Sequence, residues 1–486
     1  MLSQSSRDQN APSWWLVCVV AAMAGGMGWG IRGQYGHETG AMVAGVLVGL
    51  VFALMFCSRA PSWFAARGVA MFALGISIGG SMTYGQTVGL THDSALVGNT
   101  AALQWGLLGL FIKGGIWIGF AAAFLAMALS TTPYRPLEIA LLLVVLLFVF
   151  FLGVWLLNTP FDPANKSLPA IYFSDDWFWE PGADLKPRPE RWGGLLTALT
   201  GLYLYVAWIR GDRLARRLTL WGVLAGGIGF ATGQCVQAFH AWNAELFREG
   251  WLANLEPNIN WWNMMETTFG AIFGAILALG LWRNRTLICL RDDGEERNFE
   301  LTPGAEWLLV AVHVAALVVW SFASFRYFDR FADLAISMVI LPMVAVSAGR
   351  LWPYLVTLPI VMLPIAGKTL RQLTYNEKLW SVELGWTVLV VVPLVITTVA
   401  AFWLARGATK RHGGGSFARW SLLITTWLYF SLNQAFFHFS WPWEPWTPRT
   451  PNGTIFLICS LGLTMAALFA RRGWGRKTPA ANLSPG

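Results

Sequence analysis

The sequence predicts an all-α polytopic membrane protein with about 14 transmembrane helices. Of its 486 residues, 56% are hydrophobic and only 12% are charged, and the mean hydropathy is +0.52. This composition is too apolar for a soluble protein of that length. A spanning helix needs about 20 mostly apolar residues, and such stretches recur along the whole chain. The predicted spans cover residues 13–31, 38–57, 68–90, 101–129, 136–157, 193–210, 218–239, 264–282, 304–325, 332–349, 351–367, 381–405, 419–438 and 454–470.

The distribution of Lys and Arg predicts the orientation. If the N-terminus is cytoplasmic, the basic connections at 210–217, 283–297 and 410–419 fall on the cytoplasmic side. Cytoplasmic loops of membrane proteins carry an excess of these residues. We therefore expect both termini to be cytoplasmic and place the chain in the inner cell membrane. The formal charge of +8 then needs no nucleic-acid partner, because attraction to anionic membrane lipid accounts for it.

A glycine-rich pattern occurs three times. The first copy, AGGMGWGIRGQYGHE, covers residues 24–38, and the second, AGGIGFATGQ, covers residues 225–234. A looser third copy, GGSMTYGQTVGLTHD, covers residues 79–93. Each copy contains Gly-Gln, is followed within a few residues by His, and precedes another apolar helix. The first two copies share one orientation, which predicts an internal parallel repeat of a glycine-rich helix pair about the membrane normal.

This repeat divides the chain into two membrane units. The first unit, 13–210, has about six helices and a long outer loop at 158–192, and its uniformly apolar span 136–157 is predicted to face lipid. The second unit, 211–405, also has about six helices and is followed by two additional helices in 406–471. Residues 1–12 and 472–486 are predicted to be cytoplasmic tails.

Lys113 is the most informative charge because it lies within a predicted span. A charge in the membrane costs a few kcal/mol, so such a side chain usually faces a cavity or a partner acid. Glu38, Asp93 and Glu266 are the expected counter-ions. The alternative is that Lys113 extends its ammonium group to the outer interface.

Polar residues around the three copies predict one site near the outer side of the membrane. Four of the six histidines follow a Gln on that side. A plainer interpretation is that the glycines serve tight helix packing, while Gln and the acids cap helices and are solvated. No metal site or cofactor is predicted, since no known ligand spacing is present. The predicted substrate-binding residues are Arg32, Gln34, His37, Glu38, Gln86, His92, Asp93, Lys113, Gln234, His240, Glu266, Gln434 and His438.

The predicted function is that of a permease or secondary carrier for a small polar or anionic solute. Arg32 and Lys113 would attract the solute, and the nearby acids would bind a coupling proton or cation. One alternative is an integral membrane transferase acting on an outward-facing lipid or glycan, with an acid and a His in acid–base roles. A structural membrane subunit is the second alternative. The spread of polar residues over several helices favours the carrier, whereas their concentration on one side favours the transferase.

Overall fold

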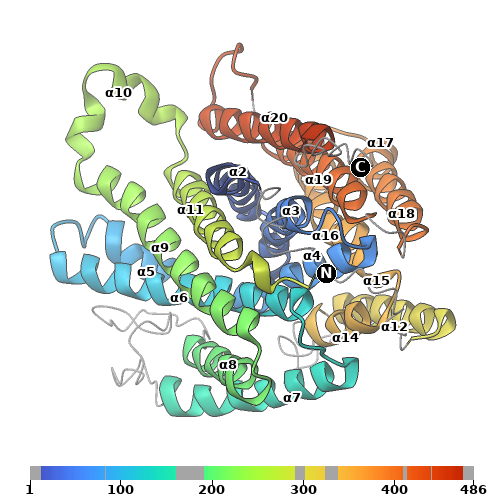
Figure 1. Ribbon diagram of the computed structural model, residues 1–486. Coiled ribbons are helices and arrows are strands. Elements are labelled where there is room, and N and C mark those ends of the chain that lie inside the picture. Colours follow the sequence, from blue (N-terminus) through green and yellow to red (C-terminus); the bar gives the residue numbers. More distant parts are fainter. Residues whose placement is uncertain are drawn as a thin grey trace, which may run out of the picture.

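The structure is a computed structural model that describes residues 12–82, 84–159, 191–289, 301–322, 338–408, 413–438 and 440–473. The regular elements in these ranges are helices, which confirms the predicted helical class (Figure 1). Most of the predicted outer loop 158–192 and of the two terminal tails lies outside the described residues. The helices that form the bundle are α2 (Trp14–Arg32), α3 (Glu38–Phe56), α4 (Ser62–Gly79), α5 (Gly85–His92), α6 (Thr100–Leu129), α7 (Pro136–Gly153), α8 (Trp192–Leu204), α9 (Arg213–Trp242), α10 (Gly250–Leu255), α11 (Trp261–Arg283), α12 (Pro303–Phe322), α14 (Leu341–Ala348), α15 (Trp352–Leu355), α16 (Val361–Leu370), α17 (Val382–Gly385), α18 (Val392–Ala405), α19 (Gly413–Phe437) and α20 (Thr450–Gly473).

Eleven helical segments among the described residues are long and apolar enough to cross a membrane. They establish a helical, multi-pass membrane protein. A helix lies within each of the other three predicted spans as well. Two of these, at 304–325 and 332–349, are only partly described, and the third is α19, which does not reach the apolarity of the eleven. The count of 14 spans therefore stays a prediction.

One predicted boundary is wrong. The third predicted span, 68–90, runs unbroken through the Gly-Gln of the third copy. Instead α4 ends at Gly79, and Gly85 and Gln86 begin the separate short helix α5. The reason is local, because Gly79 and Gly80 close the helix and a turn follows before α5 starts.

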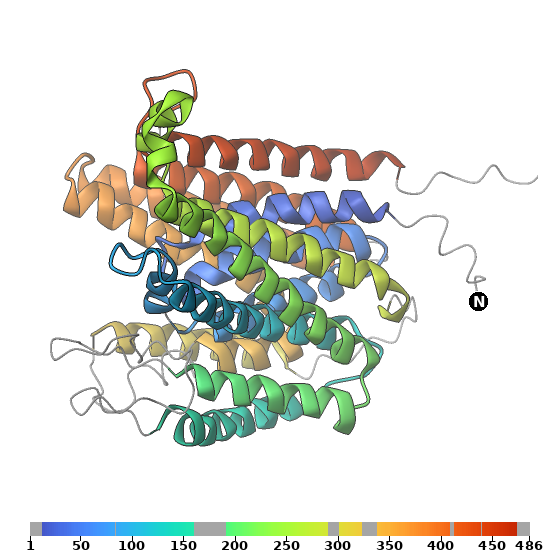
Figure 2. The same ribbon diagram turned by 90° about the vertical axis from the view of Figure 1, so that its left-hand side faces the viewer.

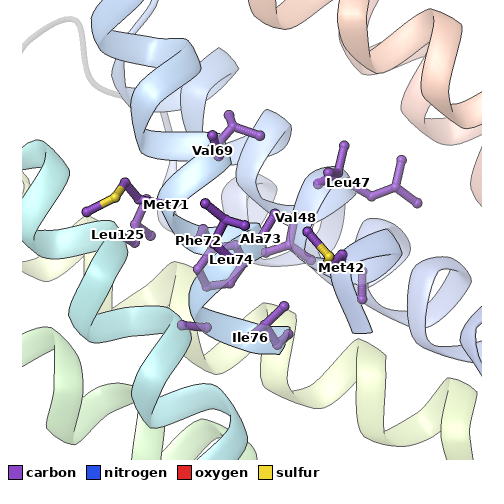
Figure 3. Close-up of a cluster of buried hydrophobic side chains, with 14 of the residues drawn as sticks. Met42, Leu47, Val48, Val69, Met71, Phe72, Ala73, Leu74, Ile76 and Leu125 are labelled. Atoms are coloured by element: carbon purple, nitrogen blue, oxygen red, sulfur yellow. The ribbon is translucent and has the colours of Figure 1, made fainter. Parts of the chain in front are cut away.

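The apolar core lies where α3, α4 and α6 pack together. Val48 on α3, Phe72 on α4 and Leu125 on α6 are among its buried side chains (Figure 3). By contrast, α7 lies at the rim of the bundle and exposes Leu137 and Phe148, as expected for a helix that faces lipid (Figure 1). The bundle therefore has a wholly buried centre and an apolar outer surface.

The central elements for the site are α2, α6, α9 and α11. Helix α2 packs along α11, and α6 packs along α9. In Figure 2 the start of α2 and the end of α20 lie at one end of the bundle, while α5 and α10 lie at the other. Side-chain caps fix the starts of three helices: Asn99 for α6, Asp212 for α9 and Asn260 for α11 each accept a backbone N–H.

Candidate functional site

The centre of the candidate site is a buried ion pair between α2 and α11. Arg32, in the last turn of α2, and Glu266, in α11, are each 2% exposed, and Arg32 Nη1 lies 3.2 Å from Glu266 Oε1. Tyr84 joins them, because Arg32 Nη1 donates to its hydroxyl at 2.6 Å and that hydroxyl donates to Glu266 Oε1 at 2.9 Å. Three residues from three separate helical regions thus share one hydrogen-bonded triangle.

His37 contacts the triangle from the loop between α2 and α3. Its Nδ1 lies 3.1 Å from Arg32 Nη2. Because a guanidinium group only donates hydrogen bonds, Nδ1 must be the acceptor and carries no proton in this arrangement. The ring is therefore neutral, with its proton on Nε2, and it helps to orient Arg32.

Aromatic rings enclose the guanidinium group. Arg32 Cζ lies 4.9 Å from the ring centroid of Trp29 and 5.2 Å from those of Tyr84 and Trp117. Phe269 packs on Trp29 with a centroid distance of 4.6 Å. Contacts between a cation and ring faces are strongest where water is excluded. The ion pair therefore lies in a closed aromatic chamber rather than at an interface with water.

Glycine backbone crossings bring these helices close enough to form the chamber. A Cβ on Gly25 of α2 would lie 2.1 Å from the carbonyl oxygen of Gly270 in α11. A Cβ on Gly33 would lie 2.7 Å from Glu266 Oε2. The carbonyl of Gly30, near the end of α2, accepts a hydrogen bond from Asn263 Nδ2 at 2.5 Å. Small residues here serve helix packing, as the plainer interpretation held, and the packing itself positions the charges.

Lys113 lies in a second polar group next to the chamber. Its side chain is 0% exposed, its Nζ donates to Thr87 of α5 at 2.6 Å, and the Nζ lies 5.2 Å from the Trp192 ring centroid. Trp117, one turn further along α6, also lies against Arg32. Lys113 is therefore buried in the bundle, and α6 links it to the ion pair.

Gln234 is fully buried within α9 and donates from Nε2 to Thr91 of α5 at 2.6 Å. Gln234 lies inside the predicted span 218–239, and helix α9 continues past it to Trp242. The neighbouring Gly233 packs directly against the Met265 carbonyl of α11.

The other predicted residues lie around the chamber or away from it. Gln34 accepts a hydrogen bond from Lys368 Nζ on its carbonyl, and Glu38 begins α3. Gln86 lies in α5, where only its backbone belongs to the described part. His92 bonds to the Val88 carbonyl.

Four further predicted residues lie at helix ends or in connections. The Asp93 side chain is 62% exposed. His240 stacks on Trp261 and lies 3.4 Å from Glu256, and His438 lies 2.6 Å from Glu377. Gln434 lies near the end of α19. In this arrangement these four residues are not part of the hydrogen-bonded triangle of Arg32, Tyr84 and Glu266.

Sequence reasoning missed Tyr84, Trp29 and Trp117, the residues that complete the chamber. Two signals for them were present. Tyr84 stands directly before the Gly-Gln of the third copy, and Trp29 occupies the position that Phe230 holds in the second copy. A comparison of the copies residue by residue points to the aromatic positions.

Three N–H donors in the chamber have no acceptor among the described residues: Trp29 Nε1, Trp117 Nε1 and Arg32 Nε. All three side chains are at least 98% buried. An unsatisfied buried donor costs about 1–3 kcal/mol, so native proteins seldom retain several together. The chamber therefore presents three buried donors that acceptor oxygens would satisfy.

Comparison of the chain with protein-family models, with curated proteins and with solved structures gave no match.

Proposed function

We propose that the protein is a proton-coupled carrier of a small organic anion, with the Arg32–Glu266 chamber as its binding site. The observation that carries this proposal is the combination of a buried ion pair with three buried N–H donors that find no acceptor in the described part of the chain. A carboxylate-bearing solute supplies both the negative charge and the acceptor oxygens that this surrounding requires. An ionisable residue buried in a membrane bundle is by default a candidate for a transport role.

Charge balance provides the coupling. Without solute, Arg32 and Glu266 neutralise each other. When a carboxylate binds Arg32, it replaces Glu266 as the partner, and an ionised Glu266 would be left buried without a counter-ion at a cost of several kcal/mol. Glu266 therefore takes up a proton as the solute binds. One anion and one proton enter together, and the net charge of the chamber does not change.

Tyr84 can assist this exchange because its hydroxyl contacts both charged partners. A hydroxyl both donates and accepts, so it can turn from the Glu266 carboxylate to the solute carboxylate without a proton leaving the oxygen. His37, as a neutral acceptor, holds the Arg32 guanidinium in place while its other partner changes.

The chamber is closed in this arrangement, because Arg32, Tyr84 and Glu266 are each at most 3% exposed. A carrier passes through such an occluded state between openings to the two sides. We place this carrier in the inner cell membrane with both termini cytoplasmic, on the distribution of Lys and Arg.

Liposomes that contain the purified protein and an internal pH indicator test the proposal. They are given inward gradients of lactate, succinate or citrate, with protein-free liposomes as the background. We expect at least one of these carboxylates to acidify the interior. Glu266→Gln should remove the acidification while keeping exchange of radiolabelled solute, because Gln imitates the protonated acid.

Glu377→Gln is the matched control, since Glu377 lies outside the predicted chamber and pairs with His438. It should leave acidification unchanged. The proposal fails if none of the carboxylates exceeds the protein-free background. A chemical change in added lipid or glycan would instead favour the transferase alternative.

A further inference from the structure

The buried face of α19 is lined by polar side chains. Ser421, Thr425, Thr426, Tyr429 and Asn433 are each at most 1% exposed and repeat at the spacing of one helix face. At 1.5 Å per residue, the stripe from 421 to 433 is about 18 Å long, more than half of a bilayer core. The segment 420–437 contains no charged residue.

Most of these side chains carry a polar atom with no partner in the ranges that the structure describes. Among the described residues, Ser421 Oγ, Thr426 Oγ1, Tyr429 Oη and Asn433 Oδ1 lie in buried positions without a hydrogen bond. Thr425 differs, since its hydroxyl donates to the Ser421 carbonyl at 2.8 Å. A buried polar group without a hydrogen bond is costly when it is dry, so four of them along one helix face indicate that water meets them.

The stripe ends beside the candidate site. Asn433 Nδ2 and Thr369 Oγ1 each lie 3.5 Å from the Tyr35 hydroxyl, at the outer limit for a direct hydrogen bond. Tyr35 follows Arg32 by three residues and donates its backbone N–H to the Arg32 carbonyl at 2.9 Å. At its other end α19 begins against Ser62, since a Cβ on Gly413 would lie 3.1 Å from the Ser62 Cβ. The stripe itself therefore runs from Ser421, about two helical turns beyond Gly413, to the loop that follows Arg32.

We propose that this face of α19 lines a water-filled track through the bundle. Its donors and acceptors are hydroxyls and one amide, which suit a chain of water molecules. The absence of charge along 420–437 makes it unsuited to an ion. The track supplies protons from the Ser421 end towards the chamber; this use rests on the proposed function, whereas the hydration of the track does not.

Hydroxyl-radical footprinting of the unmodified protein in detergent tests the hydration directly. Radicals generated from bound water oxidise nearby rings, and two buried tyrosines form a matched pair. Tyr429 and Tyr354 are both 0% exposed. The Tyr354 hydroxyl forms a hydrogen bond with Ser62 Oγ at 2.5 Å, whereas the Tyr429 hydroxyl has no hydrogen-bond partner among the described residues. We expect oxidation of Tyr429 to be at least about fivefold faster than that of Tyr354. Equal, slow oxidation of both rings would overturn the proposal.

A second measurement tests the use of the track. Thr426→Val keeps the shape of the side chain and removes its hydroxyl. We expect it to slow acidification of liposomes by about tenfold during carboxylate uptake, and to leave exchange of radiolabelled solute unchanged. If both rates stay at the wild-type level, the track carries no protons. If the wild-type protein itself moves no carboxylate, the proposed function fails, while the footprinting result still decides whether the track holds water.

Discussion

The first and second copies of the glycine-rich pattern share a scaffold. Gly25 in the first and Gly226 in the second hold the same place in A-G-G, and each crosses a neighbouring backbone. Added Cβ atoms would lie 2.1 Å from the Gly270 carbonyl oxygen and 1.9 Å from that of Gly114, respectively. Five residues after the initial Ala, Trp29 and Phe230 also correspond, and both pack on Phe269, at centroid distances of 4.6 and 4.8 Å.

The copies differ beyond the aromatic residue. The first ends its helix at Arg32 and adds a charge, whereas the second continues through the neutral Gln234. The acid that follows the second copy, Glu266, pairs with the Arg of the first. The glycines and aromatic rings therefore give both copies the same helix packing. The charged group of the site, Arg32, occurs only where the first copy differs from the second.

The largest effect is expected from a substitution that breaks the shared frame. Gly25→Val and Gly226→Val each place side-chain atoms inside a neighbouring backbone, so folded protein should be lost almost completely. The yield of monodisperse protein in detergent measures this. Gly367→Val is the control, because a Cβ at that position of α16 meets nothing within 4 Å. Equal yields of all three variants would contradict the close crossings.

Arg32→Met should have the next largest effect, because it leaves Glu266 buried without its counter-ion. Breaking a buried pair on one side costs about 3–5 kcal/mol. Unfolding by SDS titration in mixed micelles gives the free energy. The double variant with Glu266→Met should recover most of the loss, since neither charge then remains. A double variant as unstable as Arg32→Met alone would count against the pair.

Gln234→Leu, in the Gly-Gln of the second copy, should cost only about 1 kcal/mol. It removes the bond to Thr91, but the Thr91 hydroxyl keeps its own bond to the Val88 carbonyl at 2.7 Å. The same SDS titration compares the two copies. If Gln234→Leu lowered the free energy of unfolding as much as Arg32→Met does, the neutral side chains of the second copy would contribute as much to stability as the ion pair.

The smallest effect concerns the pair outside both copies, Glu377 and His438. The hydrogen bond from His438 holds the pKa of the Glu377 carboxyl below its ordinary value. A lowered folded-state pKa adds stability above the ordinary carboxyl range, and this contribution disappears as the pH falls through the lowered value. At pH 7 the Tm of Glu377→Gln should lie about 1–2 °C below that of the wild type. The difference should vanish near pH 3; a constant difference would exclude this linkage.

Hydropathy predicted the helical class and the positions of the spans, because an apolar run of this length has one stable form in a bilayer. It misplaced the break between α4 and α5, since a turn of small residues is as apolar as the helices beside it. For the site, residue type identified Arg32, Lys113 and Glu266, because charges within spans are costly. It could not choose Glu266 over Glu38 or Asp93 as the partner of a cation. That choice depends on the crossing of α2 with α11, which brings Glu266 against Arg32 although the two residues are 234 positions apart in the sequence.

This separation has a consequence for how the chain enters the membrane. At roughly 5–20 residues per second of synthesis, the helix that carries Arg32 precedes the one that carries Glu266 by about 10–50 s. During that interval Arg32 lies in or beside the bilayer while Glu266 has not yet been synthesised. His37, five residues after Arg32, is the first of its hydrogen-bond partners to be synthesised, and Tyr84 follows 52 residues after Arg32. The order of synthesis thus gives Arg32 two neutral partners before its acid, and the ion pair forms only once α11 is complete.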